Sequence, residues 1–221
     1  SPCEEAFTEP HSVTVGTKEL TIGGSFTAND KIYDDNTDAT FDENNLELIG
    51  VVGLEDVSLT GLEIDFESKE VGNHAVSITN AELAGADKDN YTLTLDDSPT
   101  TTANINPGAP VKFLVTAPDG GIITSPKLQN IPFDAKVTLV DAFDNPTPNS
   151  GGDVTVTLTG SGGATPGDLR FQGFPSDPVT QTLAADESSI DFNNILYTGV
   201  SSIAGFDVKI DADASGTGSA D

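Results

Sequence analysis

Apolar and polar residues alternate along most of the chain with a period of two, and helical periodicity is hard to find. Side chains of a β-strand point alternately to opposite faces, so this alternation predicts strands with one buried face. The strand-like runs are rich in β-branched and aromatic residues and are separated by Gly, Asn and Asp, as tight turns require. They are KELTI, LELIGVV, DVSLT, LEIDF, HAVSI and YTLTL, then VKFLVTA, AKVTLVDA, DVTVTLTG, SSIDF and GFDVKIDA.

The spacing of these runs predicts the fold class. Strands at intervals of roughly 8–20 residues, without helices between them, are typical of antiparallel β-sandwiches. A domain boundary is expected at NINPGAPV, residues 104–111, because proline cannot donate to a central sheet ladder. We therefore predict an all-β chain with two tandem antiparallel, immunoglobulin-like β-sandwich domains, 13–106 and 107–221, joined by a short, stiff Pro/Gly linker. Residues 1–12 are a tail or the end of a preceding segment.

The chain is strongly acidic. It has 36 Asp and Glu against 9 Lys and Arg, a formal net charge of −27. Nucleic acids and anionic membrane surfaces both require a cationic face, so neither is an expected partner. No apolar run approaches the roughly 18 residues of a membrane span, so insertion into a membrane is not expected. The acidity fits a soluble extracellular surface, and binding of divalent cations is the alternative.

The start of the chain and its single cysteine do not indicate a reactive site. The chain lacks Met and has no signal-like apolar run near its start, so we expect a piece of a longer protein. Cys3 cannot form an internal disulfide, and its role stays open.

The stretch FTANDKIYDDNTDATF, residues 26–41, contains a candidate calcium loop. Asp34, Asn36 and Asp38 stand at alternate positions, as the first ligands of an EF-hand loop do. The sixth position of such a loop should be Gly and the twelfth Glu, but Ala39 and Asn45 stand there. The alternative is a turn in which Asx side chains accept hydrogen bonds from amides two residues ahead. We predict the turn, and we keep Asp34, Asn36 and Asp38 as candidate calcium ligands.

Two further acidic stretches are candidate calcium sites. Asp141 and Asp144 stand with Asn145 in the stretch DAFDNP, where the alternative is a hairpin turn. Asp211 and Asp213 lie near the exit of the second domain, where a following domain would begin. Calcium is therefore the cofactor to consider.

Catalytic and cofactor-binding residues are not predicted, and we do not expect an enzyme. The chain has two histidines, His11 and His74, but no serine lies in a nucleophile elbow of the form GxSxG that a histidine could activate. The glycines of GSGGATPG have no helix to lead into, unlike those of a phosphate-binding loop.

The first half carries a recognisable motif. FTANDKIYDDNTDAT follows a pattern in which an apolar residue precedes KxYDGTTxA, and LIGVVGLEDVSLT, FESKEVGNHAVSITNAELAGADKDNYTLT and TTTANI follow in order. With these residues, 13–106 resembles the YDG repeat, a β-rich module found in tandem in large bacterial surface and secreted proteins. The glycine of that name is Asp35 here. If the position needs a positive φ, Asp tolerates it better than most residues.

The second half carries PVKFLVTAP, then PKLQNIPFDAKVTLVDAFDNPTP, DVTVTLTGSG and GFDVKIDADASG. In these segments, 107–221 resembles a bacterial immunoglobulin-like domain of the kind repeated in invasin-type and other surface adhesins. Asp144 stands where members of that family typically have glycine.

These resemblances imply a non-enzymatic stalk or spacer segment of a bacterial cell-surface or secreted adhesin, monomeric as a fragment. Its expected partners are neighbouring β-sandwich modules of the same chain, with a host or surface glycan or protein bound at a distal tip. Two alternatives stay open: a module that itself binds a glycan or protein, with or without calcium, and accessory domains of a secreted polysaccharide-degrading enzyme. Fold alone does not separate these functions.

Overall fold

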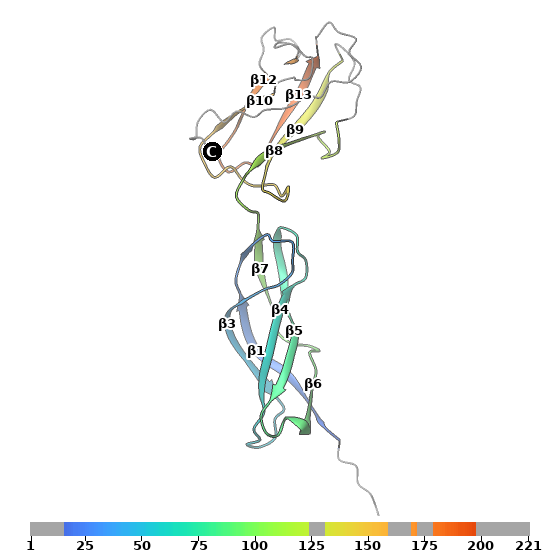
Figure 1. Cartoon of the computed structure of the whole chain (residues 1–221), viewed down its shortest axis with the longest axis vertical. Helices are drawn as coiled ribbons and strands as arrows, with labels where there is room; N and C mark the ends of the chain where they lie inside the picture. The colour runs from blue at the N-terminus through green and yellow to red at the C-terminus, as the bar shows by residue number, and fades with distance from the viewer. Residues whose placement is uncertain (1–15, 124–130, 159–168, 172–178, 198–221) are drawn as a thin grey trace, which may run out of the picture. The chain divides into compact units, whose positions relative to one another are not determined.

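The computed structural model describes residues 16–123, 131–158, 169–171 and 179–197 (Figure 1). In these residues the regular structure consists of β-strands and one three-residue 3-10 turn, η1 (Lys88–Asn90). No helix among them is long and apolar enough to cross a membrane. The predicted all-β class is confirmed. The chain divides into two compact units, unit 1 (Ser1–Asn106) and unit 2 (Pro107–Asp221).

Unit 1 is built from two sheets. One has the strand order β3-β1-β6 and the other β2-β7-β5-β4. Most pairs are antiparallel, but β1 pairs with β6, and β2 with β7, in parallel. The bounds of the strands are β1 (Lys18–Ala28), β2 (Lys31–Ile32), β3 (Phe41–Ile49), β4 (Ser58–Phe66), β5 (Gly72–Ala84), β6 (Tyr91–Leu93) and β7 (Thr100–Asn106).

Both sheets of unit 1 contribute to one core. Strand β1 presents Ile22 and Phe26, and the second sheet presents side chains of β4, β5 and β7. Between these two residues Gly24 has φ +85, and a Cβ there would lie 2.2 Å from the carbonyl oxygen of Asn45. Only glycine allows β3 to approach so closely. The buried cluster comprises Ile22, Phe26, Ile64, Phe66, Val76, Ile78, Ala103 and Ile105.

Unit 2 also has two sheets, and the pairings described in it are antiparallel. The strand orders are β11-β13-β9-β8 and β10-β12. Their bounds are β8 (Lys112–Thr116), β9 (Phe133–Val140), β10 (Val154–Leu158), β11 (Leu169–Phe171), β12 (Val179–Leu183) and β13 (Ser189–Tyr197). The strand predicted at GFDVKIDA, residues 205–212, lies outside the described residues.

The core of unit 2 follows the alternation of its sequence. In β10, Val154, Val156 and Leu158 are buried, while Thr155 and Thr157 between them are partly exposed. The cluster takes in both sheets and comprises Ala135, Val137, Val154, Val156, Leu158, Leu183, Phe192 and Ile195.

Candidate cation sites and their internal partners

The loop that contains Asp34, Asn36 and Asp38 is folded around the side chain of Lys31. The ammonium nitrogen Nζ of Lys31 lies 2.7 Å from Oδ1 of Asp34 and 2.7 Å from Oδ1 of Asn36. It also lies 3.0 Å from the backbone carbonyl oxygens of Asn36 and Asp38. Oxygens of all three candidate ligands therefore converge on a cation that the chain itself supplies.

The loop also has the local hydrogen bonds that were predicted for a turn. Oδ1 of Asp34 accepts from the amide of Asn36 at 3.3 Å, and Oδ1 of Asn36 accepts from the amide of Asp38 at 3.0 Å. These two Asx turns are confirmed. Beyond them, the amide of Ala39 donates to the carbonyl of Ile64 at 3.0 Å, which fixes the end of the loop against β4.

Asp35 has φ +65, in the left-handed region. Its side chain accepts a hydrogen bond of 3.1 Å from the hydroxyl of Tyr33 and forms an ion pair with Lys69. The hydrogen bond from Lys69 is the main reason that the pKa of Asp35 lies below its usual value, and Tyr33 adds to it. The hydrogen bond from Lys31 likewise lowers the pKa of Asp34. Asp35 thus adopts the positive φ that the sequence analysis considered for this position.

Asp141 is buried, with 1% of its surface exposed, and the donors around it saturate its carboxylate. Oδ1 accepts from the amides of Phe143 and Asn145, both at 2.9 Å. Oδ2 accepts from the amide of Gly108 at 2.8 Å and from Nδ2 of Asn145 at 3.1 Å. Burial by itself would raise the pKa of Asp141. The hydrogen bonds from Gly108, Asn145 and Phe143 outweigh burial, so this pKa lies below its usual value.

Asp144 points to a different partner. Its φ is +68, and its Oδ1 lies 2.7 Å from Nζ of the half-exposed Lys112. The structure therefore does not bring Asp141 and Asp144 together as ligands of one ion. Asp211 and Asp213 lie outside the described residues. Among the described residues, no three His, Cys, Asp or Glu side chains are grouped closely enough to hold a metal ion.

A third polar cluster ties two loops of unit 1 together. Oδ2 of Asp87 accepts from the amide of Asp56 at 2.9 Å, and Oδ2 of Asp56 accepts from the amide of Ala86 at 3.1 Å. The buried Tyr91 donates its hydroxyl to Glu55 and accepts from the amide of Val52 at 3.0 Å. These carboxylates, too, are occupied by the protein's own donors.

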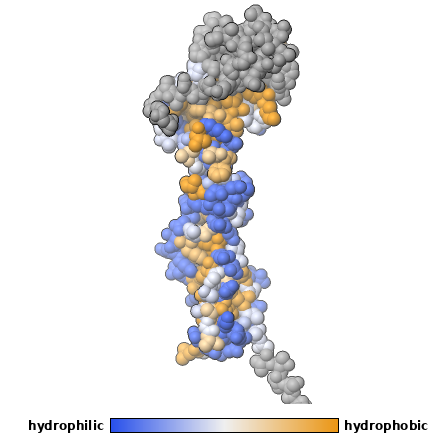
Figure 2. Space-filling view, viewed as in Figure 1, coloured by the Kyte–Doolittle hydropathy of each residue, from blue (hydrophilic) through white to orange (hydrophobic). Residues whose placement is uncertain are grey.

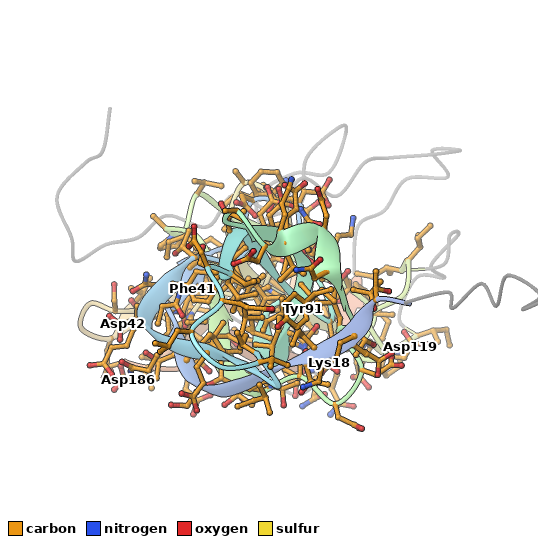
Figure 3. The ribbon with its side chains drawn as sticks, turned by 90° about the horizontal axis from the view of Figure 1, so that it is seen from below. Lys18, Phe41, Asp42, Tyr91, Asp119 and Asp186 are labelled. Atoms are coloured by element: carbon orange, nitrogen blue, oxygen red, sulfur yellow. The ribbon has the colours of Figure 1, made fainter. Side chains whose placement is uncertain are left out.

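Tyr91 lines an open groove of about 420 Å³. Lys18, which is paired in register with Tyr91, also lines it, and both are labelled in Figure 3. A second groove of about 290 Å³ lies between β3 and the start of β4, with Leu46 and Leu59 among its lining residues.

The sequence interpretation missed Lys31 and Gly108. Lys31 stands three residues before Asp34, a spacing that allows a lysine side chain to reach the loop, and this signal was available in KIYDD. Gly108 carries no such signal, because its contact with Asp141 is made through a backbone amide.

Residues 16–103 match the family described as YDG domain. No curated protein and no solved structure matches the chain. The resemblance of the first half to the YDG repeat is therefore confirmed, and Lys31, Tyr33, Asp34 and Asp35 all lie within the matched residues.

Proposed function

We propose that the chain is a non-enzymatic stalk or spacer segment of a bacterial cell-surface or secreted adhesin. Its two units are tandem β-sandwich modules, the second of them immunoglobulin-like. The observation that carries the proposal is the way the backbone is held immediately before and after Pro107.

The backbone before Pro107 is held within unit 1. Ile32 in β2 is paired with Asn106 at the end of β7. The amide of Tyr33 then donates to the carbonyl oxygen of Asn106 at 2.8 Å. The last residue of unit 1 is therefore part of a hydrogen-bonded sheet, and its torsions are restricted.

The backbone after Pro107 is held within unit 2. The amide of Gly108 donates to the buried carboxylate of Asp141 at 2.8 Å, and its carbonyl accepts from the hydroxyl of Thr147 at 3.3 Å. Three residues later, the amide of Val111 donates to the carbonyl of Val140 at 2.9 Å. Pro107 itself has a φ that its ring restricts. The backbone on each side of Pro107 is thus held by hydrogen bonds within its own unit, which supports the proposal of a spacer.

The surface charge supports the same function. Hydrophilic residues cover much of the visible face of unit 1 (Figure 2). At a net charge of −27, neighbouring copies repel one another, which keeps long surface molecules separate. The partners of such a segment are the neighbouring modules of its own chain, and the ligand is bound at a distal tip outside the cell.

Pulsed electron paramagnetic resonance tests the stiffness of the connection. One spin label is placed at Thr60 and one at Thr182, both exposed, after Cys3→Ser has removed the native thiol. We expect a narrow distribution of distances between the labels. A matched variant with Gly-Ser-Gly-Ser inserted between Asn106 and Pro107 should broaden it. A distribution equally broad without the insertion would contradict the spacer function.

A further inference from the structure

We propose that the Asp34–Asp38 loop is a cation site that carries its own cation. The ammonium group of Lys31 takes the position of a metal ion, so unit 1 forms this loop without calcium. The ligand class of the site is a primary ammonium ion, and the chain supplies that ion from strand β2.

The oxygens around Nζ of Lys31 are of the kinds that calcium loops use. They are one carboxylate oxygen from Asp34, one amide oxygen from Asn36 and the backbone carbonyl oxygens of Asn36 and Asp38. Calcium takes the same types of oxygen from the early positions of its binding loops. The loop therefore has the donor chemistry of a cation site, although it lacks the Gly and Glu of an EF-hand.

The distances from Nζ of Lys31 to these oxygens are those of hydrogen bonds. The four oxygens lie 2.7–3.0 Å from Nζ. Hydrogen bonds from nitrogen to oxygen span about 2.7–3.2 Å, whereas calcium–oxygen distances are about 2.3–2.6 Å. The contacts of Lys31 are thus those of an ammonium group with hydrogen-bond acceptors. An ammonium has three N–H donors, so the four oxygens use its whole capacity.

Lys31 also has partners outside the loop. Nζ lies 5.7 Å from the ring centroid of Phe66, a core residue, and this geometry is a cation–π contact. The backbone of Lys31 is paired in register with Ile105 of β7. Only 16% of the Lys31 side chain is exposed. Both ends of Lys31 therefore have partners outside the loop.

Lys69 provides a natural contrast in the same region. Its pair with Asp35 has 47% of the lysine side chain and 56% of the aspartate side chain exposed. Exposed pairs of this kind contribute little to stability because water competes for both charges. Removing Lys31 should therefore damage unit 1 far more than removing Lys69, although each lysine contacts an aspartate of the same loop.

The test compares Lys31→Met and Lys31→Ala with the matched control Lys69→Met in the full chain. Melting of unit 1 is followed through the amide NMR signals of Val76 and Ile105, in its core. We expect calcium chloride and a chelator to leave the melting temperature of the unmodified protein unchanged. Lys31→Met should lower it by about 5 °C or more, and the control by no more than about 1 °C.

Rescue separates a cation site from a merely structural lysine. Lys31→Ala removes the atoms of a propylammonium ion, so propylammonium chloride should restore part of the lost melting temperature. Tetramethylammonium chloride, which has no N–H donors, should not. Loss without rescue by propylammonium would show that Lys31 acts by packing, and the proposal would be wrong. Equal stability of Lys31→Met and the unmodified protein would also overturn it.

A measurement on the unmodified protein covers the case in which the variants do not fold. Ammonium protons held in hydrogen bonds exchange slowly with water, so Lys31 should give a resolved 1H–15N signal from its side-chain ammonium at neutral pH. The exposed Lys69 should not. Absence of the Lys31 signal under these conditions would contradict the proposal.

Discussion

The carboxylate of Asp141 accepts a hydrogen bond of 2.8 Å from the backbone amide of Gly108, which lies 33 residues earlier in the chain. The same carboxylate holds the turn after β9 through the amides of Phe143 and Asn145. A buried charge is tolerated when hydrogen bonds replace its water, as they do here. One acid therefore fixes both the start of unit 2 and a turn of its sheet.

Replacing Asp141 with Ala should lower the free energy of unfolding of unit 2 by about 2–3 kcal/mol, because buried backbone amides lose their acceptor. Asp144→Asn is the control, since Asp144 pairs with a half-exposed lysine and Asn also tolerates its positive φ. Equilibrium denaturation, followed through the amide NMR signals of Val137 and Val156, measures the free energy of unfolding of both variants. Equal stability of the two variants would show that Asp141 does not hold unit 2 together.

The same carboxylate predicts a pH dependence for unit 2. Because the hydrogen bonds outweigh burial, the pKa of Asp141 is lower in the folded protein than in the unfolded chain. Its contribution to stability is therefore complete above the ordinary carboxyl range, about pH 4, and is lost as the pH falls through the lower folded value. A 13C NMR titration of the Asp141 carboxyl group measures this pKa directly.

The stability difference between the unmodified protein and Asp141→Asn should shrink over the same acidic range. A folded pKa above the ordinary value, or a difference that grows on acidification, would contradict this assignment.

The alternation of apolar residues was enough to predict the all-β class. In β10 it also marks the buried face, since Val154, Val156 and Leu158 are buried and the threonines between them are not. It could not predict that β2 pairs with β7, and β1 with β6, in parallel. Alternation is the same in parallel and antiparallel strands, so the direction of a partner depends on tertiary packing.

The candidate site was predictable in part. Asx turns at Asp34 and Asn36 follow from local chemistry, and the structure confirms them. The role of Lys31 depends on residues far away in the sequence, because β2 must pair with β7 and the Phe66 ring must lie within 5.7 Å of the ammonium nitrogen. Local sequence rules contain neither relationship, so the sequence predicted the turn and its candidate ligands without predicting their contacts with Lys31.

Asp35 and Asp144 both have left-handed φ values, +65 and +68 respectively. A residue with Cβ is strained in this region, and Asp and Asn suffer less than Ala. At each position we expect the Ala variant to melt about 5 °C below the Gly variant. Both variants remove the carboxylate, so the difference between their melting temperatures reports the backbone strain alone. Equal melting temperatures would show that neither turn needs its left-handed conformation.

The contact between Tyr91 and Glu55 predicts how the stability of unit 1 changes at alkaline pH. The hydrogen bond between the Tyr91 hydroxyl and the Glu55 carboxylate is the main reason that the pKa of Tyr91 is raised. A raised folded pKa means that Tyr91 stabilises unit 1 fully below the ordinary tyrosine value, about 10. That stabilisation is lost as the pH rises through the folded value. Glu55→Gln replaces the carboxylate with a neutral amide and should bring the pKa of Tyr91 down toward the ordinary value.

Ultraviolet absorbance of tyrosinate measures this titration, and the chain has only three tyrosines to resolve. Tyr91→Phe assigns the Tyr91 step by removing it. Tyr33→Phe is the matched control, because burial is the largest cause that raises the pKa of Tyr33, with Asp35 second. Glu55→Gln should leave the Tyr33 step unchanged. If Glu55→Gln shifted both steps equally, the effect would come from the net charge of the protein and not from the Tyr91–Glu55 hydrogen bond.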